Sequence, residues 1–283
     1  MAPRVSVILT TSRYGSWDLL SCMRFQTMDK ADFEVIVVDE LFHLRPDFRH
    51  RCAFQCDHMA PWRAKDHYDN STGFNQALSQ ARGELVCFLV DYMFVDPDYL
   101  QRHWDFYKSH EGWSLSGYID RYDFPKLRED AHNGLWSMFA EPFTPTHFSA
   151  HSPVYRERKG GAGILTETCI EMPGEKIYLI PDSVPMAVLR KLNGLDEIYN
   201  GAYGVNDIDV GVRANMVGHR FALDPTLVAR KLGTPSLSAK IPGLNKPKTR
   251  TWDDNYAIFQ LRMEAIRKGR EPVAVPLERG AWR

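Results

Sequence analysis

The sequence predicts an α/β protein with a mainly parallel sheet that is flanked by helices. Three observations support this fold class. Short β-branched runs alternate with helix-like stretches along the first 110 residues, the runs are mostly apolar, and polar residues follow each run directly. With 44% hydrophobic and 25% charged residues, the composition is that of an ordinary globular protein, which excludes a disordered, collagenous or coiled-coil chain.

Three apolar runs are predicted to form strands of this sheet, at residues 5–9, 33–38 and 85–90. The polar residues that end them are 10–13, Asp39 and Asp91. Because ligands of parallel α/β sheets bind beyond the carboxyl ends of the strands, we expect a binding site at these residues.

The spacing of apolar residues predicts helices along the rest of the chain. Residues 16–28 have helical spacing, Ser71 or Thr72 is expected to cap a helix that runs through Ala81, and Pro97 is expected in the first turn of another. Further helices are predicted at residues 186–192, 207–216 and 254–268. Residues 220–223 are predicted to form a short edge strand. The alternation of helix and strand favours short connections and helices on both faces of the sheet.

The chain has 35 basic and 36 acidic residues, so its formal charges nearly cancel. This balance excludes gross charge attraction as the means of finding a partner, although a local basic patch remains compatible with it. No apolar run approaches the roughly 20 residues that cross a bilayer. Five cysteines in a chain of this length are typical of a reducing compartment, so we expect free thiols and a cytoplasmic location.

Residues 50–58 contain two cysteines and two histidines, which invites a zinc interpretation. Their spacing does not match the common ligand pairs, and a structural zinc site needs four well-placed ligands. We therefore expect a surface loop or partly buried thiols.

Four stretches of the sequence resemble one family when they are taken together and in order. They are VSVILTT at 5–11, EVIVVD at 34–39, NQALSQARGELVCFL at 75–89 and GLDEIYNGAYGVNDIDVGVR at 194–213. Over roughly residues 4–232 the chain is similar to the family 2 glycosyltransferases of the GT-A fold. The resemblance implies a transferase that moves a hexose or pentose from a nucleotide-sugar donor to an acceptor hydroxyl, with inversion in a single displacement.

The resemblance also implies a division of the chain. Residues 1–225 would form the GT-A domain, with a nucleotide-sugar half at 1–95 and an acceptor half at 96–225. Residues 226–283 would form a basic C-terminal extension that ends in a helix.

Four residues are candidates for the nucleotide-sugar pocket: Thr11, Arg13, Asp39 and Asn75. Asp39 matches the family's aspartate that contacts the base of the nucleotide. The alternative roles are structural, because small polar residues also close turns and cap helices. Arg13 is long enough to reach a phosphate or to face solvent.

Asp207 matches the carboxylate that the family uses as general base on the acceptor hydroxyl, although an aspartate there could also cap the following helix. Asn206 replaces the family's usual glutamate and retains the ability to bind an acceptor hydroxyl. Trp136 is a candidate to line the acceptor site. Asp209 is expected to pair with Arg213 on the same helix.

The metal motif of the family is degenerate in this chain. Val90 and Tyr92 occupy its two aspartate positions with Asp91 between them, and Lys231 stands near the family's late histidine. One interpretation has Asp91 bind Mn²⁺ or Mg²⁺ as the sole carboxylate, with diphosphate and water completing the shell. In the other, Arg230 and Lys231 neutralise the leaving diphosphate and no metal is required.

Residues 225–252 carry six cations and, up to Trp252, no Asp or Glu. This stretch is either a solvated tail or a surface for diphosphate or a polyanionic acceptor. We expect the acceptor to be a glycan or another hydroxylated polymer. The alternatives are a DNA-modifying glycosyltransferase acting on hydroxylated bases, a nucleotidyltransferase, and a non-catalytic nucleotide- or sugar-binding module.

Overall fold

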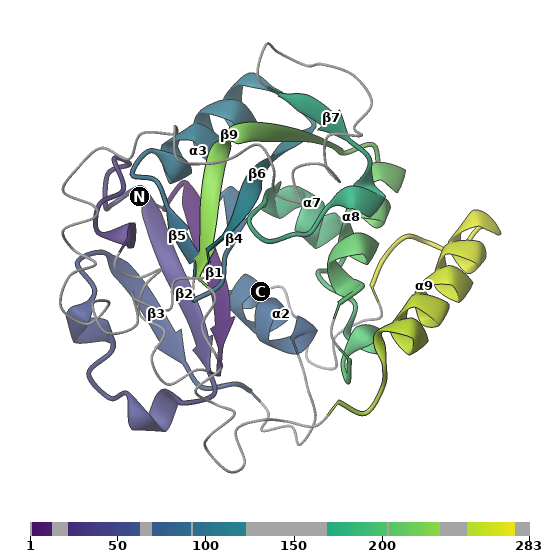
Figure 1. Cartoon of the computed structure of the whole chain (residues 1–283), viewed down its shortest axis with the longest axis horizontal. Helices are drawn as coiled ribbons and strands as arrows, with labels where there is room; N and C mark the ends of the chain where they lie inside the picture. The colour runs from purple at the N-terminus through teal and green to yellow at the C-terminus, as the bar shows by residue number, and fades with distance from the viewer. Residues whose placement is uncertain are drawn as a thin grey trace.

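Two β-sheets form the centre of the molecule, with helices around them (Figure 1). The computed structural model describes residues 2–12, 22–62, 70–91, 93–122, 169–202, 204–232 and 248–274. The first sheet has the strand order β3 (Gln55–Met59), β2 (Phe33–Asp39), β1 (Val5–Thr11), β4 (Leu85–Phe88) and β8 (Ser183–Pro185). The second has the order β5 (Met93–Val95), β9 (Arg220–Leu232) and β6 (Trp113–Tyr122), with β7 (Ile170–Met172) also paired to β9.

The predicted fold class is confirmed, because the first four of these strands are mutually parallel and β6 is parallel to β9. The strands β5, β7 and β8 pair in the antiparallel sense. In the described part of the chain, five helices complete the layers: α2 (Ser71–Gln80), α3 (Tyr99–Ser109), α7 (Met186–Lys191), α8 (Asn206–Met216) and α9 (Trp252–Arg267). Short 3₁₀ turns lie at Phe42–Leu44, Arg49–Arg51, Gly174–Lys176 and Glu197–Tyr199.

The central strands are buried on both faces, as their mostly apolar runs predict. Val7 of β1 belongs to one hydrophobic cluster with Trp104 of α3, whereas its neighbour Ile8 belongs to a second cluster with Phe74 of α2. Alternate residues of a strand point to opposite faces, so each strand contributes to both cores. Full burial of such a side chain stabilises the fold by about 1.5–3 kcal/mol.

The strand β9 corrects two predictions at once. It is a 13-residue strand in the middle of its sheet rather than a short edge strand at 220–223, and the predicted domain boundary at residue 225 falls inside it. The register with β6 shifts between Ser116 and Tyr118, so residues 224–227 of β9 bulge opposite Gly117. Proline lacks an N–H and is tolerated at such a bulge, which explains how β9 continues through Pro225.

Two short segments also differ from the predictions. Asn70 is the N-cap residue of α2, where Ser71 or Thr72 was expected. Part of the 50–58 segment is not a loop, because residues 55–59 add β3 to the edge of the first sheet in parallel with β2. Cys52 and Cys56 are half-buried free thiols, and no three His, Cys, Asp or Glu side chains gather within the part of the chain that the structure describes.

The C-terminal helix α9 docks against α8 and the turn before it. Phe259 and Met263 of α9 form a third small cluster with Tyr199 and Val205. In Figure 1 this helix lies on the outside of the molecule beside α8. None of the described helices has the length and apolarity that crossing a membrane requires.

Two buried histidines are held neutral by the fold. His103 of α3 is fully buried with Nδ1 2.8 Å from Ser183 Oγ, and His219 is 4% exposed with Nε2 2.7 Å from Ser114 Oγ. Burial lowers the pKa of His103 to about 3, with a further contribution from the charge of Arg102, and burial lowers the pKa of His219 to about 4. The unfolded chain therefore binds more protons than the folded one below the ordinary histidine pKa of about 6.5.

We predict that the free energy of unfolding falls as the pH drops from about 6.5 towards 4, by up to about 1.4 kcal/mol per pH unit for each histidine. Urea unfolding of the wild type and of His219→Gln between pH 7 and pH 4 measures this. The free energy of unfolding of the variant should fall less steeply with decreasing pH, by up to about 1.4 kcal/mol per pH unit. Equal slopes for the two proteins would show that the pKa of His219 is not lowered by folding.

Candidate functional site

Three predicted site residues meet at the carboxyl ends of the central strands. Thr11 ends β1 and stands opposite Asp39, the last residue of β2, in the parallel register. The Thr11 hydroxyl donates a hydrogen bond to the carboxylate of Asp91, which follows β4. The structure therefore brings Thr11, Asp39 and Asp91 together where the sequence placed them.

The carboxylate of Asp39 is completely buried and paired within the protein. Its Oδ1 accepts from the backbone N–H of Leu41 at 2.8 Å, and its Oδ2 lies 2.9 Å from both Arg45 Nη1 and His58 Nε2. The His58 ring in turn stacks on Phe48 at 4.0 Å. Asp39 therefore fixes the turn after β2 to β3, so any contact it makes with a nucleotide has to coexist with these pairings.

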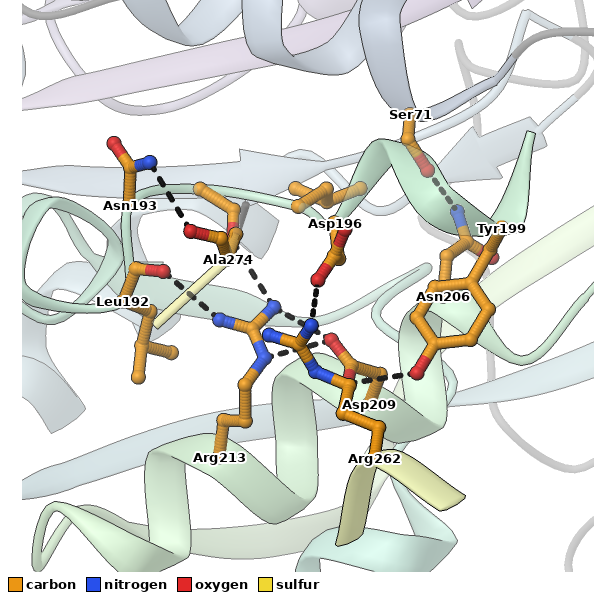
Figure 2. Close-up of polar contacts among 12 residues, drawn as sticks. Ser71, Leu192, Asn193, Asp196, Tyr199, Asn206, Asp209, Arg213, Arg262 and Ala274 are labelled. Atoms are coloured by element: carbon orange, nitrogen blue, oxygen red, sulfur yellow. Dashed lines mark hydrogen bonds and ion pairs between the residues drawn. The ribbon is translucent and has the colours of Figure 1, made fainter. Parts of the chain in front are cut away.

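The N-terminus of α2 connects the strand ends to the segment that leads into α8. Thr10 Oγ1 donates to Asn70 Oδ1 at 3.0 Å, and the backbone N–H of Ser71 donates to Asn200 Oδ1 at 3.1 Å. Asn206 Nδ2 lies 3.5 Å from Ser71 Oγ (Figure 2). A Cβ on Gly73 would lie 2.7 Å from Thr10 Cγ2, so this close approach requires glycine.

Asp207 lies in the first turn of α8, directly after Asn206. It is half-buried, and its Oδ1 accepts from the backbone N–H of Ile208 at 2.9 Å. The N-cap residue of α8 is Val205, with a positive φ of 77°, so Asp207 lies inside the helix rather than capping it.

The amide of Asn75 is committed to the protein itself. Its Nδ2 donates to the carbonyl of Leu195 at 2.8 Å and lies 3.2 Å from Glu197 Oε1, while its Oδ1 accepts from the Leu195 N–H at 2.9 Å. Asn75 is also 1% exposed. The structure thus places it under the 195–197 turn, away from the cluster formed by Thr11, Asp39 and Asp91.

The strand β5, which begins two residues after Asp91, pairs with the end of β9. In this register the backbone of Lys231 lies opposite Met93 and that of Arg230 opposite Phe94. Within the described residues Asp91 is the only carboxylate among the predicted metal ligands. A single carboxylate does not hold Mn²⁺ or Mg²⁺ by itself, so an ion would be held there only together with diphosphate oxygens. Two other predicted residues, Arg13 and Trp136, lie outside the described residues.

Four buried charged side chains and one tyrosine tie α8 to α9 and to the 192–199 segment (Figure 2). The predicted pair is present, with Arg213 Nε donating to Asp209 Oδ2 at 2.7 Å and both side chains fully buried. Arg262 of α9 pairs with Asp196 and lies 3.2 Å from Asp209 Oδ1. Tyr199 donates its hydroxyl to Asp209 Oδ1 at 3.0 Å, and burial beside that carboxylate raises the tyrosine pKa well above its usual value.

The backbone around this charge cluster is held by the same elements. Arg213 donates to the carbonyls of Leu192 and Gly194 at 2.9 and 3.1 Å. The fully buried Asn255 of α9 donates to the carbonyl of Tyr199 at 2.7 Å, and Arg250 donates to that of Ile198 at 2.5 Å. Arg213 of α8 therefore holds residues 192–194 in place, and Arg250 and Asn255 of the C-terminal segment hold residues 198–199.

The sequence analysis did not identify Arg45, His58, Asp196 and Arg262. Arg45 and His58 pair with Asp39, and Arg262 pairs with Asp196 and Asp209. No local pattern marks them. The start of α9, in contrast, has a readable signal, because Thr251 and Asp254 form a capping box before an apolar run.

The comparisons with known proteins identify the fold. No family model matches the chain, and no curated protein sequence matches it. The chain is similar to S. aureus TarS 1–349 in complex with UDP-GlcNAc, with a TM-score of 0.54 and 16% identity over 82% of this chain and 59% of that one. It is similar to the mannosyltransferase PcManGT from Pyrobaculum calidifontis in complex with GDP-Man and Mn²⁺, with a TM-score of 0.54 and 18% identity over 96% of this chain and 66% of that one.

A longer crystal structure of S. aureus TarS gives a TM-score of 0.53 at 16% identity and is covered over 37% of its length. The chain thus spans 37% to 66% of the lengths of these three structures. At these identities the likeness establishes the fold, which is the GT-A fold of glycosyltransferases.

We predict that Arg262→Met lowers the free energy of unfolding by about 3–5 kcal/mol, because it leaves the buried carboxylates of Asp196 and Asp209 with one guanidinium between them. Chemical denaturation measures the loss. Arg267→Met, an exposed arginine on the same helix, is the matched control and should stay within about 0.5 kcal/mol of the wild type. Equal stabilities of the two variants would show that the cluster does not hold α9.

Proposed function

We propose that this chain is a glycosyltransferase that moves a sugar from a nucleotide-sugar donor to an acceptor hydroxyl with inversion at the anomeric carbon. One observation carries the proposal: the N-terminus of α2 joins the strand ends, with Thr11 and Asp91, to the first turn of α8, with Asp207. A donor side and a candidate base thus belong to one connected site. The GT-A fold, shared with structures that bind UDP-GlcNAc and GDP-Man, supports the same reaction class by analogy.

In this mechanism the acceptor oxygen attacks the anomeric carbon while the bond from that carbon to the diphosphate oxygen breaks. The electron pair of the broken bond leaves on the nucleoside diphosphate. The acceptor proton passes to the carboxylate of Asp207 and from there to solvent. Asn206, beside Asp207 at the start of α8, is proposed to bind an acceptor hydroxyl, and Trp136 remains a proposed acceptor contact.

On the donor side, Thr11 and Asp91 are proposed to face the sugar diphosphate, with Arg13 nearby in the chain. We modify the roles of two other residues. Asp39 is proposed to shape the base pocket, because its hydrogen bonds hold the turn after β2. Asn75 is proposed to position the 195–197 turn, because it bonds to the backbone of Leu195.

For the leaving diphosphate, the position of Arg230 and Lys231 in β9 beside β5 supports a contribution of positive charge. A divalent cation bound by Asp91 jointly with the diphosphate would supply further charge stabilisation there. Because β9 runs to Leu232, we now place the end of the GT-A domain after residue 232 instead of at 225. A glycan or other hydroxylated polymer remains the proposed acceptor.

The variant Asp207→Asn is expected to keep its fold and its donor binding but to lose a factor of about 10²–10⁴ in kcat, the usual contribution of a general base. Turnover is measured as nucleoside diphosphate release from UDP-GlcNAc, UDP-glucose and GDP-mannose, with methyl glycosides as acceptors. Donor binding is measured by thermal shift, since a ligand that binds only the folded state raises its stability. Asp105→Asn, an exposed carboxylate on α3, is the control. Near-normal turnover in Asp207→Asn would remove this residue from the mechanism.

Metal titration and chelation distinguish a divalent cation bound by Asp91 from charge neutralisation by Arg230 and Lys231. Since Asp91 contributes one carboxylate, we expect Mn²⁺ to bind with useful affinity only when UDP or GDP is present, and Asp91→Asn to abolish that ternary binding. Calorimetric titration of Mn²⁺ with and without nucleotide measures this. Transfer activity that is undiminished in excess EDTA would reject metal use in favour of the cations Arg230 and Lys231.

A further inference from the structure

An open hollow lies at the start of α9, outside the site described above. It has a volume of about 570 Å³, and Lys248, Thr249, Arg250, Thr251, Trp252 and Asp254 line it. Two large aromatic side chains are exposed here, Trp252 at 47% and Tyr256 at 38%. Their rings stack at 4.9 Å with planes 12° apart. Exposed aromatic side chains gathered at a hollow are typical of a binding site.

The hollow is attached to the segment that leads to Asp207. The backbone N–H groups of Thr249 and Arg250 donate to the carbonyl of Gly201 at 2.8 and 3.2 Å. The indole of Trp252 lies against Gly204, where an added Cβ would be 2.9 Å from its Cδ1. Gly204 also has a positive φ of 86°. Both this backbone conformation and the contact with Trp252 require glycine at this position. Asp207 is three residues further along the chain.

The aromatic pair is held in place before any ligand arrives. The Thr251 hydroxyl accepts from the backbone N–H of Asp254, and Asp254 Oδ2 accepts from the Thr251 N–H at 2.7 Å, which fixes the first turn of α9. Asn255, next to these residues, anchors that turn to the Tyr199 carbonyl. A rigid aromatic surface loses little conformational entropy when a ligand binds to it.

We propose that this hollow is a subsite for a saccharide ring of the acceptor, an inference that rests on the proposed function. The apolar C–H face of a pyranose packs on the Trp252–Tyr256 pair, and the charged side chains of Lys248 and Asp254 bind its hydroxyls. The hollow carries both signs of charge, with Asp253 and Asp254 in the first turn of α9. Mixed charge suits a neutral, hydroxyl-rich ligand better than a nucleic acid, whose phosphates need a basic surface.

The test measures sugar binding directly, without a donor. Saturation-transfer NMR and tryptophan fluorescence follow the binding of the methyl glycosides of glucose, N-acetylglucosamine, galactose and mannose, and of cellobiose. We expect at least one of these to bind the wild type, and Trp252→Leu and Tyr256→Leu to weaken that binding about tenfold. Trp252→Phe, which keeps a ring, should restore most of it. Leu261→Ala is the matched control, because Leu261 is 68% exposed on the same helix.

Three results would overturn the subsite: no probe binds the wild type, the Leu variants bind as the wild type does, or a dT10 oligonucleotide binds through Trp252 while every sugar fails. Nucleotide-sugar hydrolysis by the wild type separates this inference from the proposed function. Hydrolysis without Trp252-dependent sugar binding overturns the subsite alone. Trp252-dependent sugar binding without turnover of any nucleotide sugar upholds the sugar site and overturns the proposed function.

Discussion

A buried ion pair between Arg213 and Asp209 sets the geometry on which the rest of the site depends. Both side chains are completely shielded from solvent, and the desolvation of each charge costs several kcal/mol unless partners surround it. Those partners come from different parts of the chain: the 192–196 segment, Tyr199 and Arg262 of α9. Leaving any of these charges unpaired would cost free energy, so α8, α9 and the 192–199 segment are held together. The placement of α8, which carries Asp207, follows from this.

The two sides of the site are built by different physical means. On the donor side, parallel strand pairing fixes Thr11 and Asp39 opposite each other, and the hydrophobic clusters on both faces keep the strands in register. On the Asp207 side, ion pairs and side-chain bonds to backbone carbonyls do the positioning. The N-terminus of α2 joins the two, through Asn70 to Thr10 and through Ser71 to Asn200.

The described part of the C-terminal segment packs on the turn that precedes α8. Arg250 binds carbonyls of the 198–200 turn, and Arg262 binds buried carboxylates. The same segment carries Trp252 against Gly204. Of the six cations in the 225–252 stretch, Arg250 thus pairs with backbone groups that no run of adjacent residues reveals.

The parallel sheet and the polar residues at its carboxyl edge are predictable from the amino-acid sequence. Strands buried on both faces are mostly apolar, and the residue after such a strand lies at the carboxyl edge, which is why Thr11, Asp39 and Asp91 could be predicted there. The family resemblance added Asp207 at the start of α8. The path of β9 through Pro225, the bonds of Asn75 to Leu195 and the place of Arg262 in the charge cluster became visible only in the folded chain. Periodicity and composition record how a residue relates to its neighbours along the chain and to the solvent. A bulge or a buried ion pair depends instead on groups that only folding brings into contact.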